Sequence, residues 1–309
     1  MSVASDSVAH DEGPHLPSEE ALWNESWYFD FADTAAGLGG WIRLGLYPNE
    51  DRAWVNVLLC GPGLPTLALN DFHAVLPADP ARVRTDGIGL DLQAQEPARS
   101  YRVAATGRAR VYDDPAAALA GGASRSAEVS LDLVWDTAGE PYRYQLVTRY
   151  EIPCTVGGTV VIDGVAHPIA AAAGQRDHSW GVRDWWAMDW VWFALHLDDG
   201  THLHAVDIRI PGAPHIGVGY VQRAGDELVE LTTIEAREAF GPNGLPISTE
   251  LVLQPGDLRV DTEVVAHAPV RLVADDGRIA EFPRAWMSVR TADGRTGTGW
   301  MEWNRNLAP

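Results

Sequence analysis

Alternation of apolar and polar residues over short segments is the main pattern along this chain. In SLDLVW (130–135) and RYQLVTRY (143–150), apolar and polar residues alternate with a period close to two, which is typical of strands with one buried face. Glycine, proline, aspartate and asparagine separate such segments along most of the chain. The pattern predicts an all-β protein whose antiparallel strands close into barrels or pack as sandwiches.

Helices are scarce in this pattern, and the division into domains follows the strand series. TTIEAREAF (232–240) is the best candidate for a short helix. The polar, acidic residues 1–19 predict a disordered tail. A break near residues 150–156 divides the remainder into two series of strands, and we therefore expect two β domains, 20–153 and 154–309.

Two Asp-Gly pairs lie between apolar runs and predict tight hairpins. One is Asp163-Gly164 and the other is Asp199-Gly200. If Asp199 and Gly200 alone form the second turn, Trp192 lies opposite Asp207, and cross-strand partners share a face. That face resembles the lining of a cavity, although a solvent-exposed face fits the same pattern; it carries Trp192, Ala194, His196, Leu203, Ala205, Asp207 and Arg209.

Composition excludes several classes of function. The chain has 309 residues and a net charge of -20, which argues against nucleic acid or an anionic membrane as a partner. All 23 basic residues are arginine, so chemistry that needs a Schiff-base or P-loop lysine is excluded. The sequence has no GxSxG, HExxH or GxGxxG motif and no apolar run long enough for a membrane span. The N-terminal residues do not resemble a signal peptide, and we expect a cytoplasmic protein.

Metal binding has only weak support in the sequence. The two cysteines are far apart, and their spacing indicates neither a zinc site nor a disulfide framework. His202 and His204 form an H-x-H pair, and His196 could add a third ligand. In the expected register, however, His196 lies on the opposite face of the sheet, so we predict no metal and no cofactor.

A tryptophan-rich stretch, GQRDHSWGVRDWWAMDWVW (174–192), holds five of the 13 tryptophans. Its first part predicts a charged turn, and its second part predicts a strand. Trp185, Trp186 and Trp190 are expected to divide between core and pocket, since adjacent strand residues point to opposite faces. The charged residues of the turn are expected to form structural ion pairs; they are Arg176, Asp177, Arg183 and Asp184.

An acid among tryptophans suits one type of reaction. Burial in an apolar pocket disfavours the charged form of a carboxyl group, which can then donate a proton. Tryptophan faces stabilise a resulting cation by about 0.5–2 kcal/mol per contact. Asp207 is the first candidate for this acid, and Glu302, between Trp300 and Trp303, is a reserve candidate.

Several motifs together resemble one known superfamily. GQRDHSWGVRDWW (174–186), ESWYFDF (25–31) and GTGWMEW (297–303) are similar to motifs of the hydroxyneurosporene synthase or carotenoid 1,2-hydratase-like group. The resemblance implies two packed lipocalin-like β domains. It also implies addition of water to an isoprenoid double bond without a cofactor, or cyclisation of the Diels–Alder type in related enzymes.

The same resemblance implies roles for individual residues. His178 and Trp180 match a His-x-Trp pair implicated in catalysis, and Asp207 matches the aspartate that donates the proton. Ala205 stands where the family has a tyrosine, which departs from the hydratase pattern. We assign the walls of the pocket, as substrate-binding residues, to Trp185, Trp186, Trp190, Trp192, His196 and Ala205.

The sequence therefore predicts a cofactor-independent hydratase or cyclase that protonates an apolar, isoprenoid- or polyketide-like small molecule. The alternative is a lipocalin-like binding protein that holds such a molecule without chemistry. Neither nucleic acid nor a membrane is expected as a partner, and the oligomeric state stays open.

Overall fold

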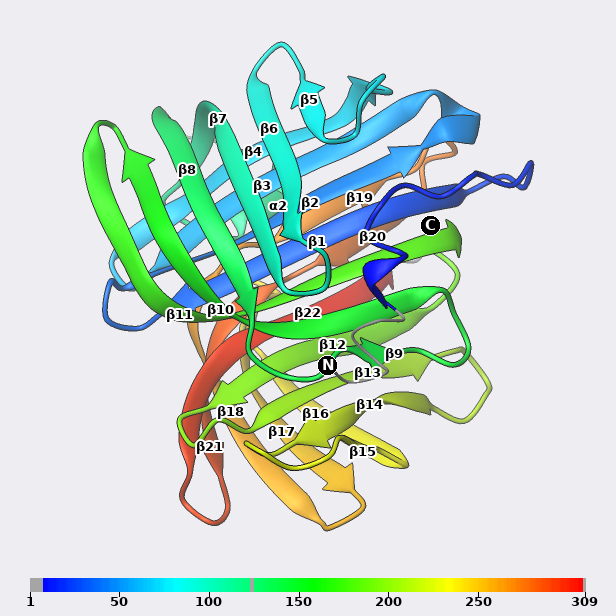
Figure 1. Cartoon of the computed structure of the whole chain (residues 1–309), viewed down its shortest axis with the longest axis vertical. Helices are drawn as coiled ribbons and strands as arrows, with labels where there is room; N and C mark the ends of the chain where they lie inside the picture. The colour runs from blue at the N-terminus through cyan, green and yellow to red at the C-terminus, as the bar shows by residue number, and fades with distance from the viewer. Residues whose placement is uncertain (1–7, 123–124, 308–309) are drawn as a thin grey trace. The chain divides into compact units, whose positions relative to one another are not determined.

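The computed structural model describes residues 8–122 and 125–307, and these form two compact units (Figure 1). Unit 1 contains the described residues among Met1–Leu59, Leu67–Val111 and Ser124–Arg183. Unit 2 contains those among Cys60–Thr66, Tyr112–Ala123 and Asp184–Pro309. Across the described ranges, no helix is long and apolar enough to cross a membrane.

Unit 1 is built on an antiparallel sheet that closes on itself through an added pairing of β4 with β7. β9 (Tyr142–Arg143) pairs with β10 beside the main path. A 3-10 turn, η1 (Pro48–Glu50), joins β2 to β3. The strand order is β4 (Leu64–Val75), β3 (Arg52–Gly61), β2 (Leu38–Tyr47), β1 (Trp23–Asp33), β11 (Val165–Val182), β10 (Arg149–Ile162), β8 (Arg125–Thr137), β7 (Ser100–Tyr112), β6 (Ile88–Glu96) and β5 (Arg82–Arg84).

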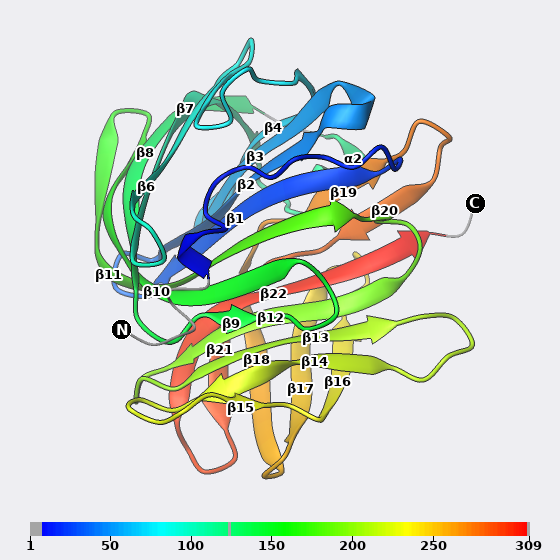
Figure 2. The same cartoon turned by 45° about the vertical axis from the view of Figure 1, so that its right-hand side comes forward.

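Unit 2 contains a second antiparallel sheet, and in Figure 2 its strands β12, β13 and β14 lie side by side. β20 (Ile279–Phe282) pairs with β19 (Val270–Val273) and β22, and α2 (Ala117–Ala120) is a single helical turn. The order of the sheet is β15 (Val229–Glu230), β14 (Ile216–Gln222), β13 (His202–Arg209), β12 (Asp189–Leu197), β22 (Thr296–Leu307), β21 (Ala285–Thr291), β18 (Leu258–His267), β17 (Pro246–Gln254) and β16 (Thr233–Phe240).

The predicted fold class is confirmed, because strands dominate both units and both sheets curl. In β8, Leu131, Leu133 and Trp135 are buried, and the residues between them are exposed or half-buried. This period of two is the pattern from which the strand was predicted. On β12 of unit 2, by contrast, every residue from Val191 to Leu197 is buried, and Val191, Phe193 and Leu195 on one face belong to a continuous apolar core.

The division between the units does not fall at residue 153. That position lies inside β10, and β11 pairs with both β10 and β1. After the turn at Asp163-Gly164, β11 runs antiparallel to β10 and adds one more strand to the first sheet. In this half of the chain, the division between the units falls between Arg183 and Asp184.

The expected disordered tail is ordered over part of its length. Val8 and Glu12 are buried, and the indole nitrogen of Trp27 donates a hydrogen bond to the carbonyl oxygen of Glu12. Residues 1–7 of the expected tail lie outside the described residues. The prediction of disorder was wrong for the part of the segment that begins at residue 8, because its polar side chains interact with buried partners on β1 and β11.

The helix predicted at residues 232–240 was also wrong, since Thr233–Phe240 form strand β16. Among the described residues it forms a ladder with β17 alone, which leaves β16 at the end of the strand order in the sheet. Charged residues such as Glu235 and Arg237 favour helices in isolation, but they also protect a sheet edge from pairing with other chains. Pairing with β17 overrides the local preference.

The two Asp-Gly turns differ in length. At Asp163-Gly164 both residues have positive φ, and Ile162 pairs with Val165 as predicted for a two-residue turn. At the second turn only Gly200 has positive φ. The Leu197 amide bonds the Thr201 carbonyl, and His196 pairs with His202. The second loop therefore has three residues, and the predicted register was wrong by one position.

Candidate functional site

The register of the second hairpin decides which side chains share a face in unit 2. Trp192 lies opposite Val206 on β13 and Glu302 on β22, while Asp207 lies opposite Val191. A shift of one residue moves every side chain of one strand to the other face. Asp207 therefore lies on the face of Val191 and Leu203 and not on that of Trp192, which corrects the expected pairing.

We call the side that contains Trp192 the histidine–tryptophan face. It spans β12, β13, β14, β21 and β22, and it is buried except for the partly exposed His202. It is defined by Trp192, His196, His202, His204, Tyr220, Trp286, Trp300 and Glu302.

His196, His202 and His204 lie on this one face of the sheet, although His196 was predicted to lie on the face opposite the other two. His196 Nδ1 lies 2.9 Å from His202 Nδ1, so one hydrogen is shared between the two rings. His204 Nδ1 donates to the carbonyl oxygen of Phe193 at 2.9 Å. The His204 ring also meets Trp192 and Tyr220, each with a centroid separation of 5.7 Å.

His196 is the most unusual of these groups. It is 7% exposed, and its Nε2 has no hydrogen-bond partner among the residues that the structure describes. Burial, with His202 and His204 nearby, lowers the pKa of His196 well below its ordinary value. The imidazole is therefore neutral at physiological pH and presents one unpaired nitrogen on an aromatic face.

Glu302, the reserve acid, lies on this face among tryptophans. Its carboxylate accepts a hydrogen bond from Trp190 Nε1 at 2.9 Å and forms a buried ion pair with Arg284. The guanidinium of Arg284 lies 5.7 Å from the centre of the Trp192 ring. This contact adds a cation–π interaction to the ion pair.

Asp207 lies in an ion-pair network instead of an aromatic pocket. It is 1% exposed and accepts a hydrogen bond from Arg209 Nε at 2.9 Å. Arg209 also pairs with Glu238 at 2.6 Å, and His215 Nδ1 lies 3.1 Å from the other Asp207 oxygen. Burial lowers the pKa of Arg209, but Glu238 and Asp207 outweigh burial and raise it overall. A permanently charged partner favours a structural role for Asp207.

The other predicted pocket residues are dispersed. Ala205 lies in the apolar core of unit 2. Trp185 and Trp190 pack against each other at 5.7 Å and against Phe282. Trp186 instead packs beneath the guanidinium of Arg278 at 5.3 Å. Of the predicted substrate-binding residues, Trp192 and His196 belong to the histidine–tryptophan face. Trp190, two residues before Trp192 on β12, lies on the same side of the sheet.

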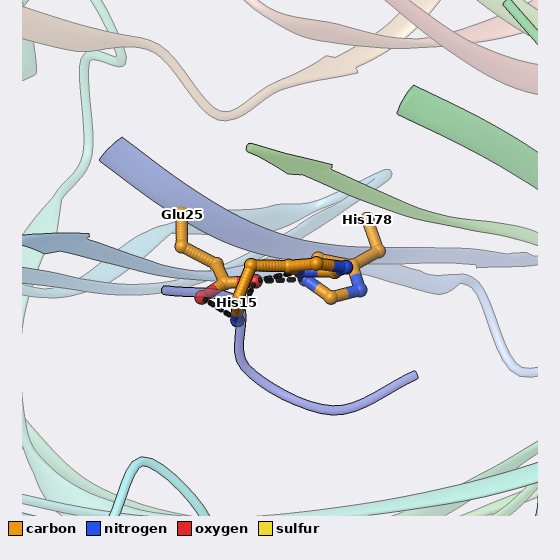
Figure 3. A group of neighbouring side chains, drawn as sticks. All are labelled: His15, Glu25 and His178. Carbon is orange, nitrogen blue, oxygen red and sulfur yellow. Dashed lines mark hydrogen bonds and ion pairs between the residues drawn. The ribbon is translucent and has the colours of Figure 1, made fainter. Parts of the chain in front are cut away.

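In unit 1, the His178-Ser179-Trp180 motif lies on strand β11 and not in a turn. His178 and Trp180 share a face with Glu25 and Trp27 of β1. His178 Nε2 lies 2.9 Å from Glu25 Oε1 (Figure 3). Trp180 stacks on His15 with a centroid separation of 3.8 Å. His178 therefore has its contacts within unit 1, whereas Asp207 belongs to unit 2.

Three of the four residues predicted to form ion pairs have a charged partner, and each partner is distant in the sequence. Arg176 pairs with Glu12 at 2.8 Å, and Asp177 pairs with Arg149 at 2.8 Å. Asp184 lies 3.5 Å from Arg278. Arg176 and Asp177 are adjacent on a strand and point to opposite faces, so they cannot pair with each other.

Arg183 is the fourth residue of that predicted set. Burial, with Arg149 nearby, lowers its pKa to about 10, and Asp177 opposes this shift. Its backbone amide donates to the carbonyl oxygen of Leu22. Arg183, the last residue of unit 1, is therefore a half-buried cation close to a second cation, Arg149.

Sequence reasoning missed several residues of these sites. Glu25 lies within the ESWYFDF motif, and its alternation with Trp27 could have indicated a shared face. Tyr220 could be placed only after the register of β13 and β14 was known. No local signal identifies His15, because its contacts come from strands that are distant in the sequence.

Comparison with known proteins gives a family and a set of similar folds. A family model described as "Domain of unknown function (DUF7064)" matches residues 8–307. None of the curated proteins matches the sequence.

Several solved structures resemble this chain, and three of them illustrate the likeness. An AttH-type protein from Nitrosomonas europaea has 15% identity and a TM-score of 0.65, with 99% of this chain and 97% of that chain covered. Kievitone hydratase from Nectria haematococca has 14% identity and a TM-score of 0.60, with 92% and 89% covered. CghA has 10% identity and a TM-score of 0.56, with 93% and 89% covered. At these identities the likeness establishes the shared fold, and the narrower likeness to hydroxyneurosporene synthase stays a prediction.

Proposed function

Because the chain belongs to the DUF7064 family, whose description assigns no function, we propose its function from its structure. We propose a hydratase or cyclase that transfers a proton to or from an apolar, isoprenoid- or polyketide-like small molecule. The histidine–tryptophan face of unit 2 is the proposed substrate surface. The observation that carries the proposal is the buried, neutral His196, whose Nε2 has no hydrogen-bond partner among the described residues.

The His196–His202 pair suits proton transfer in both directions. When the shared hydrogen lies on His196 Nδ1, Nε2 of the same ring is an acceptor; when it lies on His202, Nε2 is a donor. Hydration of a double bond needs one proton delivered to carbon and one taken from water. Two imidazoles that share a hydrogen can supply both steps without a net change in their charge.

The surrounding aromatic rings suit a substrate that gains positive charge. The indoles of Trp192 and Trp300 lie on the same face as His196, and both are buried. Each indole face stabilises a nearby cation by about 0.5–2 kcal/mol. The same rings could also hold a polyene in a folded conformation, as cyclisation requires.

The similar structures support this proposal at the level of fold. One of them is a hydratase by name, kievitone hydratase, and another, CghA, was crystallised with Sch210972. Both share two curled antiparallel sheets with this chain, and the resemblance of the motifs at residues 25–31, 174–186 and 297–303 implies the same two reaction types.

The test uses a panel of prenylated aromatic compounds and polyene polyketides, incubated with purified protein and followed by liquid chromatography–mass spectrometry. Hydration appears as the gain of one water mass, and cyclisation appears as a new isomer of unchanged mass. We expect His196→Gln to reduce turnover about 10²- to 10⁴-fold, the usual contribution of a general acid or base. His73→Gln, at an exposed position of β4, is the control and should retain turnover.

Two outcomes would contradict the enzyme proposal. Wild-type turnover in His196→Gln, with an unchanged circular dichroism spectrum, would exclude proton transfer by His196. Saturable binding of panel members without any product would favour the lipocalin-like binding protein.

A further inference from the structure

A cluster of two histidines and a glutamate in unit 1 lies outside the proposed substrate surface. Its members are His15 from the N-terminal segment, Glu25 on β1 and His178 on β11 (Figure 3). His15 Nδ1 lies 2.7 Å from Glu25 Oε1, and His178 Nε2 lies 2.9 Å from the same oxygen. The three ligand atoms all lie within 4.8 Å of one another.

In each histidine ring, the nitrogen that faces away from Glu25 determines whether the nitrogen that faces Glu25 can present a lone pair. His178 Nδ1 lies 2.7 Å from the carbonyl oxygen of Asp11, which can only accept, so this nitrogen carries the hydrogen. His15 Nε2 lies 3.5 Å from the carboxylate of the same Asp11. Metal-binding histidines typically donate their second ring N–H to a carbonyl or a carboxylate in this way.

The two ring nitrogens and the carboxylate oxygen can therefore all direct lone pairs toward one position between them. With the hydrogens on the outer nitrogens, His15 Nδ1 and His178 Nε2 both direct lone pairs toward the oxygen of Glu25. Short contacts between acceptors repel unless protons or a cation lie between them. One divalent ion in contact with all three atoms removes this repulsion.

The rings are held in place for this role. His15 stacks on Trp180 with an interplanar angle of 9°, and His178 stacks on Trp27 at 4.5 Å. The backbone amide of His15 donates to both oxygens of Glu25, at 3.0 and 2.9 Å. Glu25 and His178 are buried, but the His15 side chain is 23% exposed, which leaves a route for an ion.

We propose that His15, Glu25 and His178 form a zinc site that ties the N-terminal segment to strands β1 and β11. Two imidazole nitrogens and one carboxylate oxygen are a ligand set that zinc accepts, with water in the fourth position. Asp11 is a positioning residue that orients both rings. The site is in unit 1 and does not depend on the proposed function of unit 2.

The test uses tag-free full-length protein, treated with a chelator, dialysed and titrated with zinc chloride by isothermal calorimetry. We expect a single ion per chain, with elemental analysis giving the same stoichiometry. His15→Gln should abolish measurable zinc uptake. His10→Gln is the matched control, because His10 lies in the same segment but is exposed. His196→Gln should bind zinc like wild type.

Cobalt(II) gives a second readout, since intense visible absorption reports a four-coordinate site with nitrogen and oxygen ligands. Hydrogen exchange on the wild-type chain adds a measurement that needs no variant, and zinc should increase protection of residues 8–15. No zinc uptake by the wild-type apoprotein would overturn the proposal. So would equal uptake by His15→Gln, or zinc binding without added protection of residues 8–15.

Discussion

Trp192 lies directly opposite Glu302 in the ladder between β12 and β22. Glu302 also accepts a hydrogen bond from Trp190 and pairs with Arg284, whose guanidinium lies over the ring of Trp192. The carboxylate that faces the tryptophans is therefore Glu302 and not Asp207. Trp190 and Trp192 of β12, Glu302 of β22 and Arg284, the residue before β21, form one polar–aromatic cluster.

This cluster predicts a large stability effect at Glu302. Glu302→Gln removes the carboxylate charge that pairs with the buried guanidinium of Arg284, and we expect a loss of about 3–5 kcal/mol in the free energy of unfolding, measured with guanidinium. Glu235→Gln removes an exposed pair with Arg237 and should cost no more than about 1 kcal/mol. Arg284→Met combined with Glu302→Leu should recover most of the loss, and equal stability of Glu302→Gln and wild type would contradict the role of the pair.

The register of β13 predicts a structural role for Asp207. Asp207→Asn weakens the pair with Arg209, so the free energy of unfolding should fall by about 1–3 kcal/mol, while turnover of a panel substrate stays close to wild type. Asp226→Asn, at an exposed position, is the control for stability. Loss of turnover in a well-folded Asp207→Asn protein would instead support the proton-donor role predicted from the sequence.

The buried His196 and the half-buried His267 predict that stability falls in mild acid. Burial lowers the pKa of both His196 and His267 below their ordinary value of 6.5, so below that pH the unfolded chain binds more protons than the folded chain. Stability should be fully present above pH 6.5 and should fall as the pH drops toward the folded pKa values, by at most about 1.4 kcal/mol per unit for each group.

Denaturation curves at several pH values measure this slope. His196→Gln and His267→Gln should each make it shallower, and the double variant should do so further. An unchanged slope in the double variant would show that other groups cause the acid sensitivity.

The N-terminal segment is predicted to contribute to the stability of unit 1. Glu12→Gln removes the partner of Arg176, whose side chain is 3% exposed. Burial lowers the pKa of Arg176, but Glu12 and other neighbours raise it overall, so the guanidinium stays charged. We expect a loss of about 3–5 kcal/mol, measured by denaturation.

Glu19→Gln is the matched control, because Glu19 lies in the same segment and is exposed. It should change stability by less than about 0.5 kcal/mol. If both variants unfold alike, the segment does not depend on the Glu12–Arg176 pair.

Local patterns predicted the fold well where burial alone decides the structure. The alternation in β8 and the first Asp-Gly turn were both read correctly, because each depends on residues that are close in the sequence. Strand β16 was misread as a helix, since its partner β17 lies beyond the window of any local pattern. Its alternating charged residues fit either structure until the neighbouring strand is known.

By itself, the sequence determined that this chain folds into antiparallel strands, excluded lysine chemistry, and identified Trp192, His196 and Glu302 as residues of interest. Only the tertiary structure decided which of them share a face. Asp163-Gly164 and Asp199-Gly200 are the same dipeptide, yet one forms a two-residue turn and the other ends a three-residue loop, and that single residue moves Asp207 to the core side. The tertiary structure alone also brought His15 to Glu25 and His178, because hydrogen bonds between distant strands, and not the spacing of residues along the chain, determine which side chains meet.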